Sequence, residues 1–170
     1  VILGYYDMND EHRQLCRFLQ NTRRRKKLSL TPRYTFKSCI ITQGMALWHI
    51  INDPNVRILI YSDTATKAEK FLRGIKGHIL GNYGQSRFKE FFGNLQPVDS
   101  VWNESNIVVS TRRNSSVEPT VDTGGIDTSK VGMHYDIIFF DDIVSKLNVS
   151  TKLQMDKVFD CYNEALALLK

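Results

Sequence analysis

Lys37 and Ser38 begin an expected helix after an apolar stretch, and this pair of side chains can bind phosphate and magnesium. Residues 28–41 are expected to form a short strand, a tight loop and the start of that helix. The first turn of a helix leaves backbone N–H groups unpaired and carries partial positive charge. The ammonium of Lys37 would reach the terminal phosphates of a nucleotide, and the hydroxyl of Ser38 would contact a phosphate-bound Mg²⁺.

A second pair of candidate residues, Asp141 and Asp142, ends an apolar run at residues 135–140. The run has the character of a buried strand. In nucleotidases with a phosphate-binding loop, a strand of this kind ends beside the loop and presents a carboxylate to the metal. A neighbouring acid can then orient the attacking water. The two patterns, in this order and at domain-scale spacing, predict nucleotide hydrolysis.

Each pattern also has an ordinary structural interpretation. The usual loop G-x-x-x-x-G-K-[ST] has glycines where this chain has Thr31 and Phe36, so its backbone is less free to adopt positive φ. Lys-Ser at the start of a helix is common, and two acids at the end of a strand often belong to a turn. A nuclease metal site is a further alternative, which needs additional carboxylates that the sequence does not identify.

Strands and helices are expected to alternate along most of the chain, which favours an α/β fold with a parallel sheet and helices on both faces. Expected strands lie at residues 28–31, 56–61, 106–111, 117–123 and 135–140, and Gly124-Gly125 is expected to form a turn. Expected helices lie at residues 9–21, 38–51, 64–79 and 151–170, the last with Leu153 and Phe159 facing inward. Ligands bind at the carboxyl ends of parallel strands, where both Lys37 and Asp141 fall.

Four stretches, at residues 12–19, 32–38, 53–60 and 132–142, carry a resemblance to a known family. The specific ones are the Pro-Arg-x-x-x-Lys-Ser loop and the His-Tyr-Asp strand. Together they resemble the ATPase domain of the large terminase subunit, the motor that packages DNA into tailed-phage capsids. The resemblance implies a P-loop NTPase fold of the ASCE type, with a mostly parallel central sheet. It also implies that residues 1–170 are a single ATPase domain, excised from a protein with a C-terminal nuclease domain.

The resemblance assigns roles residue by residue. Lys37 would bind the β- and γ-phosphates, while Ser38 and Asp141 would hold Mg²⁺. Asp142 would activate the attacking water, where many family members have glutamate, and Arg33 would sense or stabilise the γ-phosphate. The catalytic residues are then Lys37, Asp142 and Arg33. The whole loop is expected to contact the nucleotide through Pro32, Arg33, Tyr34, Thr35, Phe36, Lys37 and Ser38.

The implied activity is Mg²⁺-dependent ATP hydrolysis that drives double-stranded DNA into a viral procapsid in the host cytoplasm. The implied partners are the DNA, the portal, the small terminase subunit and further copies of this chain in a ring. A neighbour in the ring could donate an arginine, with Arg112, Arg113 and residues 23–25 as candidates, so the isolated domain should hydrolyse ATP slowly. The alternatives are another P-loop motor, such as a helicase-like translocase, and a non-catalytic nucleic-acid-binding module.

Composition is that of an ordinary globular chain with a basic bias. Of 170 residues, 42% are hydrophobic and 24% are charged, and no apolar run is long enough to span a membrane. Cys16, Cys39 and Cys161 match no zinc or disulfide pattern, which favours a reducing compartment. The net charge of +5 is compatible with a polyanionic partner. The basic run at residues 23–27 is expected to form either a solvated turn or a contact with a nucleic acid or nucleotide.

Overall fold

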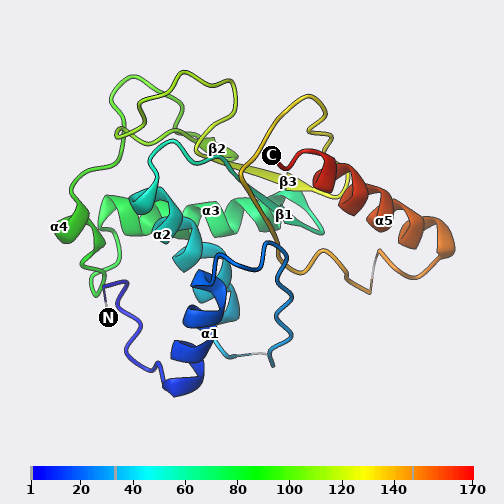
Figure 1. Ribbon diagram of the computed structural model, residues 1–170, viewed down its shortest axis with the longest axis horizontal. Coiled ribbons are helices and arrows are strands. Elements are labelled where there is room, and N and C mark those ends of the chain that lie inside the picture. The colour runs from blue at the N-terminus through cyan, green and yellow to red at the C-terminus, as the bar shows by residue number, and fades with distance from the viewer. Residues whose placement is uncertain (1, 33, 147) are drawn as a thin grey trace.

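The computed structural model describes residues 2–32, 34–146 and 148–170. Within them the chain forms a four-stranded sheet with helices packed against it (Figure 1). The strands are β1 (Ile58–Ser62), β2 (Asn106–Ile107), β3 (Val121–Gly125) and β4 (Ile137–Phe140). The helices are α1 (Asp10–Gln20), the π-helix η1 (Cys39–Gly44), α2 (Met45–Asn52), α3 (Ala65–Leu80), α4 (Phe88–Phe92) and α5 (Lys152–Ala167).

β1 lies inside the sheet and pairs in parallel with β3 on one side and with β4 on the other. β2 pairs antiparallel with β3, so the strand order is β2-β3-β1-β4. The predicted α/β class is confirmed, whereas the prediction of a mostly parallel sheet is wrong because the sheet is mixed. The connection from β2 to β3, residues 108–120, is irregular. Parallel neighbours need a long crossover, usually a helix, and without one β2 and β3 run in opposite directions.

Alternate residues of β1 face opposite layers of the core, as the pleat of a strand requires. Ile60 packs with Leu47 of α2 and Leu72 of α3 in the larger apolar cluster. Leu59 belongs to a second cluster, which includes Ala165 of α5. Helices therefore cover both faces of the sheet. The carboxyl ends of β1, β3 and β4 point to one edge, which we call the carboxyl edge.

Three helices begin at a side chain that accepts a hydrogen bond from the backbone N–H three residues on, which satisfies an otherwise unpaired donor. These caps are Asn9, Thr64 and Thr151. The helices predicted at residues 9–21, 64–79 and 151–170 are confirmed with slightly different bounds. No helix in the described part of the chain is long and apolar enough to cross a membrane.

The strand predicted at residues 28–31 does not form. The segment has no strand conformation, and the exposed fractions of Leu28 and Leu30 are 76% and 86%. Alternating apolar residues make a stable strand only where a neighbouring edge and a buried face are available, and neither accompanies this segment. Lys37 is therefore positioned by the helix that it begins rather than by a preceding strand.

Two further predictions differ from the structure. Gly124 and Gly125 belong to β3 rather than to a turn. A Cβ on Gly125 would lie 2.5 Å from the backbone nitrogen of Ala65, so the glycine allows β3 to approach the start of α3. In α5, Leu153 and Phe159 are exposed, because a narrower stripe faces the sheet. The buried residues of that stripe are Val158, Cys161 and Ala165.

Candidate functional site at the carboxyl edge

Lys37 and Ser38 form the first turn of the helix that continues into η1 and α2. The backbone N–H of Ile40 donates to the carbonyl of Phe36 at 2.9 Å, which closes that turn. The Ser38 side chain makes no capping hydrogen bond with the helix backbone. Its hydroxyl is therefore not used by the helix start, where a ligand would meet unpaired N–H groups.

Lys37 contacts Asp142, one of the two acids predicted to share its site. Its Nζ donates to Oδ1 of Asp142 at 3.2 Å, although the two residues are 105 positions apart in the chain. The side chains are 31% and 65% exposed, respectively. An ion pair this exposed adds little to stability, typically about 0–1 kcal/mol. Its significance is positional, because the start of the helix and the end of β4 reach the same point.

Asp141 is held more firmly than Asp142. Its side chain is buried, and its Oδ2 accepts a hydrogen bond from Oγ1 of Thr42 at 2.7 Å. Its backbone N–H donates to the carbonyl of Tyr61 at 2.9 Å, which continues the pairing of β1 with β4. Asp141 is thus fixed on both its main chain and its side chain, as a ligand-binding carboxylate should be.

Thr42 was not anticipated from the sequence. It lies in η1, and π-helical turns of this kind occur frequently at functional sites. The sequence offers one signal, a polar residue that directly follows Ile40 and Ile41 in the helix predicted at residues 38–51. Periodicity alone does not show that the Thr42 side chain points to Asp141, because the π-helical turn changes which residues face the sheet.

The phosphate-loop segment adopts left-handed backbone conformation without glycine. The φ angles of Tyr34 and Phe36 are 65° and 52°, and that of Asp142 across the site is 50°. Such angles cost L-residues free energy and concentrate at functional sites, where surrounding contacts must hold them. Phe36 has such contacts, because its ring lies 5.9 Å from that of His12 and 6.2 Å from that of Tyr5.

Among the other loop residues that the structure describes, Tyr34 and Thr35 do not contact Asp141. Tyr34 is fully exposed, and the Thr35 hydroxyl donates to the carbonyl of Pro32 at 2.8 Å. Arg33 lies outside the described residues. Of the loop residues predicted to contact the nucleotide, Lys37 and the first helical turn are the ones that lie beside the acids.

Magnesium fits the donors present at this edge. Among the described residues, no group of three or more His, Cys, Asp or Glu side chains could hold a metal. Magnesium needs no such group, because it is usually bound by one or two carboxylates together with substrate phosphates and water. Asp141 and the Ser38 hydroxyl suit an ion that arrives with a nucleotide, not one that the protein alone retains.

Two surface depressions lie apart from Lys37, and the smaller of them follows the carboxyl ends of β1 and β3. One, of about 360 Å³, is lined by residues of the 97–115 region, and the other, of about 240 Å³, lies beside Asp63 and Lys157. Neither is lined by Lys37, Asp141 or Asp142. The Lys37–Asp142 pair therefore lies outside both depressions.

The arginines considered for transfer to a neighbouring subunit differ in availability. Nη1 of Arg112 donates to the carbonyl of Glu118 at 2.7 Å, and Arg112 is half-buried. Arg113 is exposed, as are Arg23, Arg24 and Arg25. Burial makes Arg112 the least suited of these candidates to reach a second protein molecule.

No protein-family model matches this chain, and no curated protein matches it either. The resemblance to the terminase ATPase domain therefore depends on the sequence stretches that carry it. The geometry at Lys37, Asp141 and Asp142 is the structural observation that bears on function.

Proposed function

We propose that this chain binds a magnesium nucleoside triphosphate at the carboxyl edge of the sheet and hydrolyses its terminal phosphate. One observation carries the proposal: Lys37 Nζ lies 3.2 Å from Asp142 Oδ1 across 105 positions of sequence. A nucleotidase needs a cation at a helix start beside acids at a strand end, because its chemistry is mostly positioning and charge stabilisation. Both groups are present, and the buried Thr42 holds the neighbouring acid, Asp141, by a hydrogen bond.

Each residue has a distinct proposed task. Lys37 and the N–H groups of its helical turn neutralise the β- and γ-phosphates, while Ser38 and Asp141 hold the Mg²⁺. Asp142, which is exposed, orients and deprotonates the attacking water. Bound Mg²⁺ would offset phosphate charge as it builds up in the transition state. Hydrolysis begins only after the nucleotide has displaced Asp142 from Lys37.

We further propose, from the resemblance to large terminases, that the nucleotide is ATP and that hydrolysis moves double-stranded DNA into a viral procapsid. The assembly would be a ring of this chain with portal and small terminase subunits in the host cytoplasm. The positive net charge and the exposed basic residues 23–26 suit a DNA partner. An arginine from a neighbouring copy would raise the rate, so a dilute monomer should turn over slowly.

Calorimetric titration with Mg·ATP tests the proposal on the wild type, Lys37→Ala and Asp141→Ala, with duplex DNA binding measured in parallel. Both substitutions should weaken nucleotide binding at least about tenfold, because each removes a charged contact. DNA binding should remain in Lys37→Ala. Unchanged nucleotide affinity in both variants, or no affinity in the wild type, would reject the nucleotidase and favour a nucleic-acid-binding module.

A further inference from the structure

Two arginines lie at the opposite edge of the sheet, where the amino ends of the parallel strands meet and which we call the amino edge. Arg57 directly precedes β1, and its Nε and Nη2 donate to the two carboxylate oxygens of Asp136 at 3.0 and 2.7 Å. Its backbone N–H also donates to Asp136, at 2.9 Å. Nη1 lies 3.8 Å from a carboxylate oxygen of Glu118. The charge of Arg57 is therefore fully paired.

Arg112 presents the same guanidinium edge without a partner. Its Nη1 donates to the carbonyl of Glu118, but Nε and Nη2 are buried and have no hydrogen-bond partner in the described part of the chain. The nearby acids are already engaged, since Asp136 pairs with Arg57 and Glu118 accepts from Ser116 and from the backbone N–H of His134. Buried donors are nearly always satisfied, so this pair requires an explanation.

The electrostatic surroundings destabilise the unpaired charge of Arg112. Burial is the main cause that lowers the pKa of Arg112, and the positive charge of Arg57 lowers it further. The same two causes mean that an anion placed against Nε and Nη2 would relieve both the desolvation and the repulsion between the guanidinium groups. Arg57 has such an anion in Asp136, and Arg112 does not.

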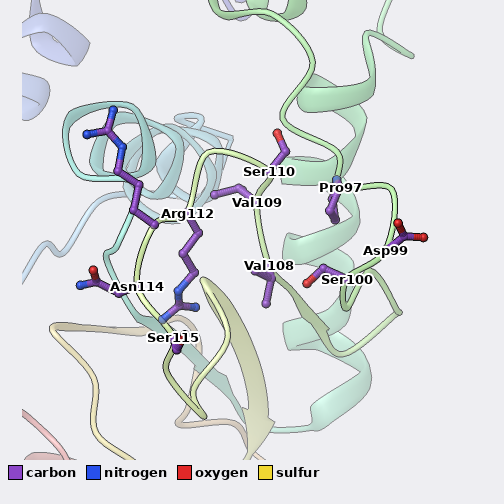
Figure 2. Close-up of a pocket in the computed structure, with 10 residues that line it drawn as sticks. Pro97, Asp99, Ser100, Val108, Val109, Ser110, Arg112, Asn114 and Ser115 are labelled. Atoms are coloured by element: carbon purple, nitrogen blue, oxygen red, sulfur yellow. The ribbon is translucent and has the colours of Figure 1, made fainter.

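Arg112 also lines the larger of the two depressions, which has a volume of about 360 Å³ (Figure 2). The lining includes a second guanidinium, that of Arg113, and three serine hydroxyls. The serines are Ser100, Ser110 and Ser115. The acidic lining residue, Asp99, lies on the far side of the depression from Arg112 in Figure 2. Ser115 lies beside the Arg112 guanidinium in Figure 2, whereas Ser100 lies on the side of Asp99, so the side of the depression next to Arg112 is positively charged.

We propose that this depression binds a phosphate group through Nε and Nη2 of Arg112, with Arg113 and the Ser115 hydroxyl as additional donors. A phosphate has more acceptor oxygens than a carboxylate, so it can use the further donors as well as the guanidinium edge. The two nitrogens expose almost no surface, so a phosphate would reach them only after the side chains that cover them had moved. The phosphate comes either from a nucleic-acid backbone or from a free phosphate compound.

This site is separate from the nucleotide site, and the experiment keeps them apart. Amide chemical shifts are followed by NMR in the Lys37→Ala background, which removes phosphate binding at the carboxyl edge. Inorganic phosphate, a short DNA duplex and acetate are the three probes. Phosphate or duplex should shift the amides of residues 98–100 and 108–115, and acetate should bind much more weakly.

Two variants in the same background provide the comparison. Arg112→Lys keeps the charge but loses the paired N–H groups, and it should weaken phosphate binding about tenfold. Arg113→Lys, the matched control, should weaken it less than about threefold, because Arg113 is exposed. Saturation by duplex but not by inorganic phosphate would identify nucleic acid as the source of the phosphate.

The proposal fails if neither phosphate probe shifts these amides, or if Arg112→Lys and Arg113→Lys weaken binding equally, which would indicate non-specific charge attraction. Acetate binding as tight as phosphate would replace the phosphate with a carboxylate and also overturn it. Because the shifts of the Lys37→Ala protein with Arg112 intact are informative alone, the test does not depend on Arg112→Lys folding normally.

Discussion

The carboxyl and amino edges of the sheet both join oppositely charged side chains from distant parts of the chain, but they do so in different ways. At the carboxyl edge, a single hydrogen bond connects Lys37 with Asp142, and both side chains have solvent access. At the amino edge, three hydrogen bonds connect Arg57 with Asp136, and Arg57 is mostly buried. The first contact is easily exchanged for a ligand, whereas the second is part of the fold.

The difference follows from what each pair must do. Arg57 and Asp136 directly precede β1 and β4, so their contacts fix the register of two parallel strands. Lys37 follows the loop and Asp142 follows β4, where a bound ligand could replace the contact between them. Substitutions at the amino edge should therefore reduce stability, and substitutions at the carboxyl edge should reduce nucleotide binding or hydrolysis.

Arg57→Ala should have the largest effect. It removes the two side-chain hydrogen bonds to Asp136, while the backbone one remains, and it leaves the buried Glu118 carboxylate without its ion-pair partner. Loss of one partner from a largely buried pair destabilises a protein on the order of 3 kcal/mol. Chemical denaturation monitored by circular dichroism measures the change in unfolding free energy.

The matched control is Arg87→Ala. Arg87 makes the same two-nitrogen contact with Glu90, at 2.8 Å for each bond, but both side chains are exposed. Its loss should not measurably change stability. Equal effects of the two substitutions would show that burial does not distinguish the amino edge from an ordinary surface pair.

The amino edge should also give the protein a dependence on acid. The hydrogen bond from Ser116, with those from backbone N–H groups and the charge of Arg57, lowers the pKa of Glu118 to about 2 from its ordinary 4.5. A carboxylate with a depressed folded-state pKa stabilises the fold above its unfolded-state pKa. That contribution, on the order of 3 kcal/mol, should be lost as the pH falls from about 4.5 towards 2.

Denaturation midpoints across this pH range measure the effect, with Glu118→Gln as the comparison. The variant should be less stable than the wild type near neutral pH and should lose less stability on acidification. A wild type and variant with parallel pH profiles would contradict the role given to Glu118.

Local signals predicted much of the fold, and non-local packing accounts for the rest. Thr64 and the apolar spacing after it predict α3 nearly to the residue, because caps and periodicity act within a few turns. Gly124 and Gly125 have the local signature of a turn, and only their contact with Tyr61 and the start of α3 explains their place in a strand. The exposed Leu28 likewise shows that an apolar pattern does not specify a pairing edge.

The candidate site divides in a similar way. Asp141 and Asp142 could be predicted, because parallel strands bring their carboxyl ends to one edge whatever the details of packing. Lys37 is predicted from its place at the start of a helix, although the strand expected before it does not form. Thr42 could not, because its direction depends on the π-helical turn, which sequence periodicity does not encode. The unpaired edge of Arg112 depends on which acids its neighbours already engage, and that also is decided by tertiary contacts.

Thr42→Val should affect both stability and ligand binding at the carboxyl edge. The substitution keeps the shape of the side chain and removes the donor to the buried Asp141 carboxylate. A buried acceptor left without its donor costs about 1–3 kcal/mol. Mg·ATP binding should also weaken, because the Asp141 carboxylate loses its orientation. Thr35→Val is the control, since the Thr35 hydroxyl contacts only the exposed loop, and retention of full Mg·ATP affinity by Thr42→Val would remove Thr42 from the site.

Asp142→Asn should change stability least and function most selectively. The Lys37–Asp142 pair is exposed, so its loss should alter the unfolding free energy by less than about 1 kcal/mol. Mg·ATP affinity should stay the same or rise slightly, because Lys37 is released and a negative charge near the phosphates is removed. Hydrolysis, measured as phosphate release, should nevertheless be abolished, since the amide cannot accept a proton from water. A variant that binds Mg·ATP and still hydrolyses it at the wild-type rate would assign the attacking water to another residue, whereas loss of binding would mean that Asp142 holds the nucleotide itself.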